Sequence, residues 1–117
     1  MTRIRQDQAS STSRFRLVDF ARVADAALRA SAAVVDGLLP EGHRQGAEWV
    51  ARNPRRPDQR AGSFKVNLNT GKWSDFATGD KGGDLISLAA FVTDLPQREA
   101  AIRLAESLGV EPYQGSR

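Results

Sequence analysis

The chain has 117 residues, of which 40% are hydrophobic and 26% are charged, a composition typical of one small globular domain. It contains no cysteine and one histidine, His43, which excludes disulfides, cysteine nucleophiles and zinc sites with cysteine ligands. No apolar run approaches the roughly 20 residues that a membrane span needs, and the N-terminus lacks the apolar stretch of a signal peptide. We therefore expect a cytoplasmic protein with no membrane partner, no metal and no cofactor.

The first part of the chain changes from polar to amphipathic. Residues 1–16 are rich in Ser, Thr, Gln and Arg, which predicts a flexible basic tail. Apolar residues then recur at helical spacing over residues 19–37. We expect Asp19 to cap the start of this helix and Gly37 to end it.

The middle of the chain carries the β signals. Pro and Gly residues predict turns from Pro40 onward, with room for a short strand at residues 47–51. Phe64, Val66 and Leu68 then alternate with polar residues, and a second alternating run follows the turn at residues 69–71. This pattern predicts a β-hairpin over residues 64–76.

Two helices are expected after the glycine-rich residues 79–83. Asp84 is a candidate N-cap for an apolar helix over residues 85–93. Asp94 and Gln97 form a capping-box pattern before a helix over residues 95–108, and Gly109 is a candidate C-terminal stop.

Together these signals predict an α+β fold: a small antiparallel sheet packed with three helices, one N-terminal and two C-terminal. We expect a flexible basic tail at 1–16, a single domain at 17–110 and a C-terminal tail at 111–117.

The glycine loop does not predict phosphate binding. A P-loop needs a Lys followed by Ser or Thr, whereas Lys81 is followed by Gly82 and Gly83. If Asp84 caps the next helix, its carboxylate also occupies the amides that a phosphate would use. We expect a tight connection between a strand and a helix.

The sequence does not predict an enzyme. Asp75, Asp80 and Asp84 could serve a metal-dependent phosphotransfer site, but they lack a partner carboxylate at recognisable spacing. No serine has a positioned base, because His43 stands alone in a turn-rich stretch.

Basic residues around the hairpin are the candidate binding site. Cations attract phosphates without regard to sequence, and an exposed aromatic ring can stack on an unpaired base. The alternative is a solvated strand face with Trp73 packed in the core. Alternation places Trp73 and Asp75 on one face and Ser74 and Phe76 on the other, without showing which face is buried. The candidate nucleic-acid-binding residues are Arg55, Arg56, Arg60, Lys65, Lys72, Trp73 and Lys81.

Residues 46–110 resemble the N-terminal zinc-binding domain of bacterial, phage and plasmid DNA primases. The resemblance rests on "GSFKVNLNTGKWSDFATGDKGGDLISLAAF" followed by "LPQREAAIRLAESLGV". Ser63, Phe64 and Val66 match the first strand, and Phe76 matches the second. The loop is matched by Gly82, Gly83 and Asp84. The last helix is matched by Ala101, Leu104, Ala105, Leu108 and Gly109.

The resemblance also implies that the zinc ligands are missing. Asp75 and Thr78 stand where the family has its second ligand pair, and Asn53 and Pro54 lie close to the expected first pair. Arg55 and Arg56 follow at the same corner. The chain is therefore similar to a cysteine-less, zinc-free variant of a zinc-ribbon-like hairpin domain. A structural zinc contributes on the order of 10 kcal/mol in small fingers, so the helices must bury enough apolar surface to compensate.

For function, the resemblance implies a non-catalytic module that binds nucleic acid, with single-stranded DNA favoured. Such a module would act in replication or transfer of a plasmid, phage or other mobile element. The alternative is a protein-interaction or inhibitor module built on a degenerate primase domain, whose partner would be a replication or conjugation protein. A nucleotide-binding enzyme is a third possibility that the failed P-loop match disfavours.

Overall fold

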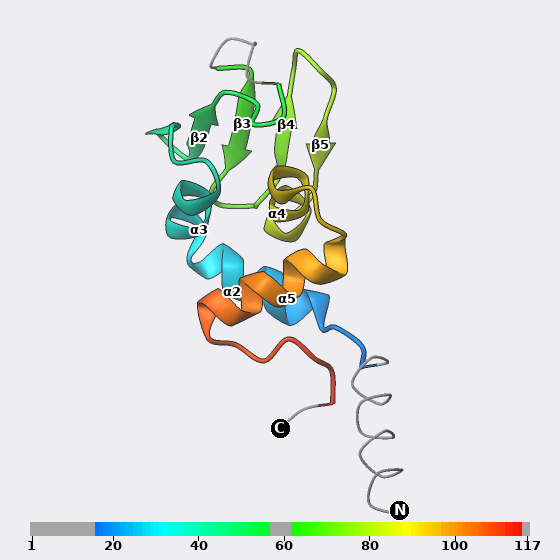
Figure 1. The fold of residues 1–117 in the computed structure, drawn as a ribbon. Coiled ribbons are helices and arrows are strands. Elements are labelled where there is room, and N and C mark those ends of the chain that lie inside the picture. Colours follow the sequence, from blue (N-terminus) through cyan, green and yellow to red (C-terminus); the bar gives the residue numbers. More distant parts are fainter. Residues whose placement is uncertain (1–15, 57–61, 116–117) are drawn as a thin grey trace, which may run out of the picture.

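The computed structural model describes residues 16–56 and 62–115, which form four helices and one five-stranded antiparallel sheet. This arrangement confirms the expected α+β class. In Figure 1 the sheet lies at the top, α2 and α5 cross at the bottom, and α3 and α4 lie between them. The helices are α2 (Phe20–Arg29), α3 (Ser31–Leu38), α4 (Leu85–Thr93) and α5 (Gln97–Leu108). The strands are β1 (His43–Gln45), β2 (Glu48–Ala51), β3 (Phe64–Asn67), β4 (Trp73–Asp75) and β5 (Lys81–Gly82).

The N-terminal helix differs from the expectation because it is divided into α2 and α3. Asp19 caps α2 as expected, since its carboxylate accepts a hydrogen bond from the Arg22 backbone N–H at 3.0 Å. The helix breaks at Ala30, with φ −116° and ψ 33°. Gly37 lies inside α3 and does not end it. The break lets α2 pack against α4 and α5 while α3 turns towards the sheet (Figure 1).

The sheet is a meander in which each strand pairs with the next, from β1 to β5. The hairpin predicted over residues 64–76 is confirmed as β3 and β4, with Phe64 opposite Asp75 and Val66 opposite Trp73. The short strand expected at residues 47–51 is β2. The two edge strands, β1 and β5, have two or three residues each and were not predicted.

An aromatic cluster joins the sheet to α4. The rings of Phe64 and Trp73 stack with centroids 5.5 Å apart, and Phe91 of α4 lies 5.9 Å from the first ring and 5.0 Å from the second. The Trp73 indole N–H also donates to the Ser87 hydroxyl at 2.9 Å. Helix α4 therefore covers the face of the sheet that carries Phe64, Val66 and Trp73, all of which are buried.

Gly82 in the glycine loop allows Trp73 and Ser87 to pack closely. Gly82 lies opposite Trp73 in the sheet, and a Cβ atom at Gly82 would approach the Trp73 indole nitrogen and the Ser87 hydroxyl to 2.4 Å. Asp84 caps α4 as expected, and its carboxylate accepts from the Ser87 N–H at 2.8 Å. The structure thus supports the loop as a tight strand-to-helix connection, with the first amides of the helix used by Asp84.

The expected capping box before the last helix is wrong. Asp94 is the C-cap of α4, in the left-handed conformation at φ 58° and ψ 43°. Pro96 is the N-cap of α5 and makes no side-chain capping bond. Gly109 ends α5 in the left-handed conformation, as expected.

The segment after α5 runs back along the start of the described chain. The Asp19 N–H donates to the Pro112 carbonyl, and the Gln114 N–H donates to the Leu17 carbonyl, both at 2.7 Å. The Arg22 guanidinium contacts the carbonyls of Glu111 and Tyr113 as well. No helix in the described part of the chain is both long and apolar enough to cross a membrane.

Candidate functional site

The sheet face opposite α4 carries an open groove. Because Phe64 and Val66 point towards α4, the intervening side chains of β3 point to the other face. On this face Lys65, Asn67 and Ser74 are half-buried and Phe76 is exposed. The groove has a volume of about 650 Å³ and is lined by Glu48, Lys65, Asn67, Lys72, Trp73, Ser74, Phe76, Lys81, Gly82 and Gly83.

Three lysines gather in this groove. Lys65 of β3 lies opposite Ser74 of β4, which lies opposite Lys81 of β5. The side chains of Lys65 and Lys81 therefore lie in one row across the sheet, with Ser74 between them. Lys72 joins the row from the turn before β4. None of these lysines forms an ion pair with any residue that the structure describes. Their charges are therefore available to a bound anion.

Phe76 supplies an exposed aromatic ring beside the lysines. This residue is 78% exposed, and the Lys65 ammonium lies 5.7 Å from the ring centroid. Phe76 is absent from the predicted binding residues, although the alternation of the strand indicates its position. If Trp73 packs in the core, strand alternation places Phe76, three positions later, on the open face.

Trp73 belongs to the core, and only a small part of it borders the groove. Only 5% of it is exposed, and its ring packs against Phe64 and Phe91. Of the two alternatives for Trp73, the structure therefore supports the packed one. A base could not reach the ring face, so the expectation of stacking on Trp73 is wrong.

Two of the predicted arginines, Arg55 and Arg56, do not line the groove. The Arg55 guanidinium lies 3.3 Å from the Asp94 carboxylate and 5.2 Å from the centre of the Phe91 ring, which places it on the side of α4. Arg56 is exposed in the turn that follows Asn53. Arg60 lies outside the described residues. Of the predicted set, the structure brings together Lys65, Lys72 and Lys81.

A hydrogen-bonded corner stands at one end of the β3–β4 hairpin. The Asn53 side-chain amide donates to the Asp75 carboxylate at 2.7 Å and approaches the Asp80 carboxylate at 3.4 Å. The Thr78 hydroxyl donates to Asp80 at 2.7 Å. Asn53 and Asp75 are 0% and 1% exposed, so these bonds satisfy polar groups that water does not reach. We call Asn53, Asp75, Thr78 and Asp80 the polar corner.

The residues of the polar corner do not fit a zinc ion. Zinc in structural sites is bound by thiolates and imidazoles in tetrahedral geometry, whereas this corner offers an amide, a hydroxyl and two carboxylates that already bond one another. No group of three or more His, Cys, Asp or Glu residues in the described ranges could hold a metal. The hydrogen bonds themselves connect the chain segments here.

Hydrogen bonding also sets the charge state of Asp75. Burial by itself would raise the pKa of this carboxyl, but hydrogen bonds from the Asn53 side chain and the Ala77 backbone N–H outweigh burial and hold the pKa below 3.8. The buried carboxyl is therefore ionised at neutral pH.

This lowered pKa predicts acid sensitivity. A carboxyl with a lower pKa in the folded state adds stability above its unfolded pKa, and that stability is lost as the pH falls through the folded pKa. We expect the free energy of unfolding of the wild type to exceed that of Asp75→Asn at pH 7 and pH 5. The difference should shrink as the pH falls below 3.8. Urea denaturation at each pH measures it, and a difference independent of pH would contradict the prediction.

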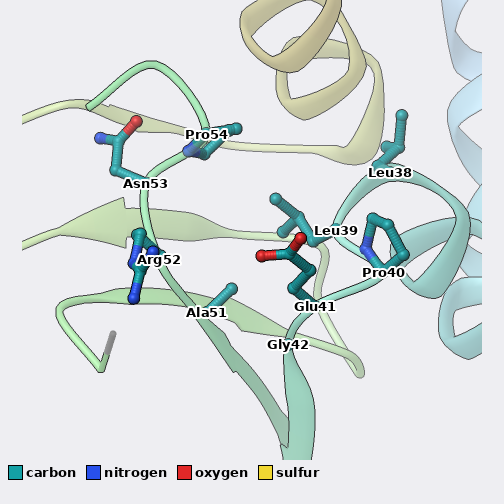
Figure 2. A pocket seen from close by; sticks show the side chains of 9 residues that line it. All are labelled: Leu38, Leu39, Pro40, Glu41, Gly42, Ala51, Arg52, Asn53 and Pro54. Atoms are coloured by element: carbon teal, nitrogen blue, oxygen red, sulfur yellow. The ribbon is translucent and has the colours of Figure 1, made fainter. Parts of the chain in front are cut away.

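A second pocket, of about 270 Å³, is lined in part by Asn53 of the polar corner. Figure 2 shows Leu38, Leu39 and Pro40 on one wall and Ala51 to Pro54 on the other, with the Glu41 side chain between them. Most of the lining is apolar, and Arg52 is the single basic residue among the described residues that form it. The cations of the candidate site thus gather in the sheet groove and not in this pocket.

No family model matches the chain, and no curated protein sequence matches it. Among solved structures, the chain is similar to the Aquifex aeolicus primase in a crystal structure of its zinc-binding and RNA polymerase domains. The TM-score is 0.57 with 27% sequence identity over 72% of this chain and 21% of that chain. The chain thus spans about a fifth of the primase fragment that it matches. This likeness supports the resemblance to primases, and the absence of cysteines is consistent with a zinc-free variant.

Proposed function

We propose that the chain is a non-catalytic module that binds single-stranded DNA in the groove of its sheet. The observation that carries this proposal is the row of lysines, which form no ion pair with any described residue, beside the exposed ring of Phe76. The likeness to a primase fragment gives further support. By the same likeness, we propose a role in replication or transfer of a plasmid, phage or other mobile element.

The groove offers the two interactions that single strands require. Lys65, Lys72 and Lys81 can each neutralise a phosphate, and Phe76 can stack on a base that is not paired. In a duplex the bases are already stacked on each other, so the ring would have no partner there. The combination favours a single strand over a duplex.

Salt dependence tests this proposal. If the three lysines each contact a phosphate, the logarithm of the association constant should fall with the logarithm of salt concentration with a slope near −2, or about 20-fold between 50 and 200 mM. Fluorescence anisotropy with a labelled single-stranded oligonucleotide measures the slope. The same sequence as a duplex is the control and should bind more weakly. Absence of binding at low salt, or an affinity indifferent to salt, would refute the proposal.

The protein-interaction alternative draws on the same ring, because exposed aromatic residues are common anchors at protein interfaces. Capture from a cell extract treated with nuclease separates the two functions. A partner bridged by DNA should disappear after treatment, whereas a directly bound replication or conjugation protein should persist. Persistence together with no binding to DNA would favour the alternative.

A further inference from the structure

Among the described residues that line the groove, Glu48 is the one carboxylate. Glu48 of β2 lies directly opposite Asn67 of β3, so the two side chains lie on the same face with Cβ atoms about 5 Å apart. Both line the groove with the three lysines. Within the part of the chain that the structure describes, Glu48 forms no ion pair. A carboxylate here repels phosphates, so it must face another part of a bound strand.

Asn67 is oriented by the hairpin turn. Its side-chain oxygen accepts hydrogen bonds from the Asn69 N–H at 2.8 Å and from the Thr70 N–H at 3.1 Å. The oxygen is therefore occupied, and the amide NH₂ remains as a donor. Glu48 and Asn67 thus place an acceptor with two oxygens beside a donor.

This pair of side chains matches one base better than the others. The Watson–Crick edge of guanine presents two adjacent donors, N1–H and N2–H₂, next to the O6 acceptor. A carboxylate can accept from both donors while an amide donates to O6. Adenine and cytosine offer one amino group each, and thymine offers a single N–H between two carbonyl oxygens that would repel the carboxylate. Guanine alone satisfies both carboxylate oxygens at once.

We infer that Glu48 and Asn67 select an unpaired guanine in the strand that occupies the groove. This inference rests on the proposed function and adds a base preference to it. The lysines and Phe76 would bind the strand without regard to sequence, whereas Glu48 reads one base edge. Because a paired guanine uses its Watson–Crick edge in the duplex, the selection also requires a single strand.

The test compares short oligo-dT strands that differ at one central position, measured by fluorescence anisotropy at low salt. We expect guanine at this position to bind at least about fivefold more tightly than thymine, the lower limit for a good bidentate contact. Inosine lacks the N2 amino group and should lose most of the gain. The analogue 7-deazaguanine keeps the Watson–Crick edge and should retain it.

A matched pair of variants assigns the preference to Glu48. Glu48→Gln keeps the size of the side chain but has only one acceptor oxygen, so the ratio between guanine and thymine should fall to within about twofold. Binding to the thymine strand should not weaken, because a negative charge is removed from the groove. Glu41→Gln makes the same chemical change at the other pocket (Figure 2) and should keep the wild-type ratio.

The outcomes distinguish the two levels of inference. Equal affinity for the guanine and thymine strands, or an unchanged ratio in Glu48→Gln, would overturn the guanine preference and leave single-strand binding in place. Failure of every strand to bind would overturn the proposed function itself, and the base preference with it.

Discussion

Replacing Asn53 with Ala is expected to lower the free energy of unfolding by about 3 kcal/mol, because the substitution leaves a buried carboxylate without its main donor. Asn53 is 0% exposed and donates to Asp75 at 2.7 Å. Its side-chain oxygen also accepts from the Arg55 N–H at 2.9 Å. One substitution therefore removes bonds to two chain segments. Urea denaturation at pH 7 measures the loss.

Asn69→Ala is the matched control for this prediction. Asn69 is an exposed asparagine in the β3–β4 turn, and its replacement should change stability by less than about 0.5 kcal/mol. In a double-mutant cycle with Asp75→Ala, the loss caused by Asn53→Ala should become smaller, because the orphaned charge is gone. A loss for Asn53→Ala no larger than that of the control would contradict the role of the polar corner.

Reversing the charge of two groove lysines is expected to reduce the affinity for single-stranded DNA at least about tenfold at low salt. Lys65→Glu/Lys81→Glu removes two phosphate contacts and adds repulsion at both ends of the lysine row. The slope of the logarithm of the association constant against the logarithm of salt concentration should also become shallower by about 1.4, because two fewer phosphates are neutralised. Fluorescence anisotropy gives both quantities.

The control is Arg29→Glu/Arg103→Glu, which changes the formal net charge by the same amount. These arginines are 69% and 65% exposed. They lie on α2 and α5, which are at the opposite end of the molecule from the strands in Figure 1. If DNA binding depends on the groove, this variant should stay within about threefold of the wild type. Equal losses in the two variants would mean that net charge, and not the groove, determines binding.

The strongest local patterns predicted the structure well. Alternation over Phe64 to Leu68 was sufficient for the hairpin, because one face of β3 is buried and the other is not. Asp19 and Asp84 were recognisable as N-caps because their side chains bond within their own helix. These features depend on residues a few positions apart.

Other features depend on contacts between distant residues and left no local signal. Asp94 precedes Pro96 as an N-cap would, yet it ends α4 and pairs with Arg55 from the other half of the chain. Nothing in the sequence around Ala30 marks the break between α2 and α3, since neither Gly nor Pro stands there.

The candidate site was predicted in part for a similar reason. Lys65 and Lys72 were predictable because they flank a recognisable turn. Phe76 was missed, and Trp73 was chosen in its place, because the period of a strand shows which residues share a face but not which face a helix will cover. Phe91 on α4 packs against Phe64 and Trp73, so the face that carries these two rings is the buried one.

The polar corner also bears on when the domain can fold and under which conditions it stays folded. A corner held by zinc becomes stable only after a metal ion has been delivered, and its thiolates are open to oxidation. The bonding groups of this corner are all part of the chain, and its outermost members, Asn53 and Asp80, are 27 positions apart. The corner therefore needs no metal to be delivered before it forms, and neither zinc starvation nor an oxidant removes any of its bonds.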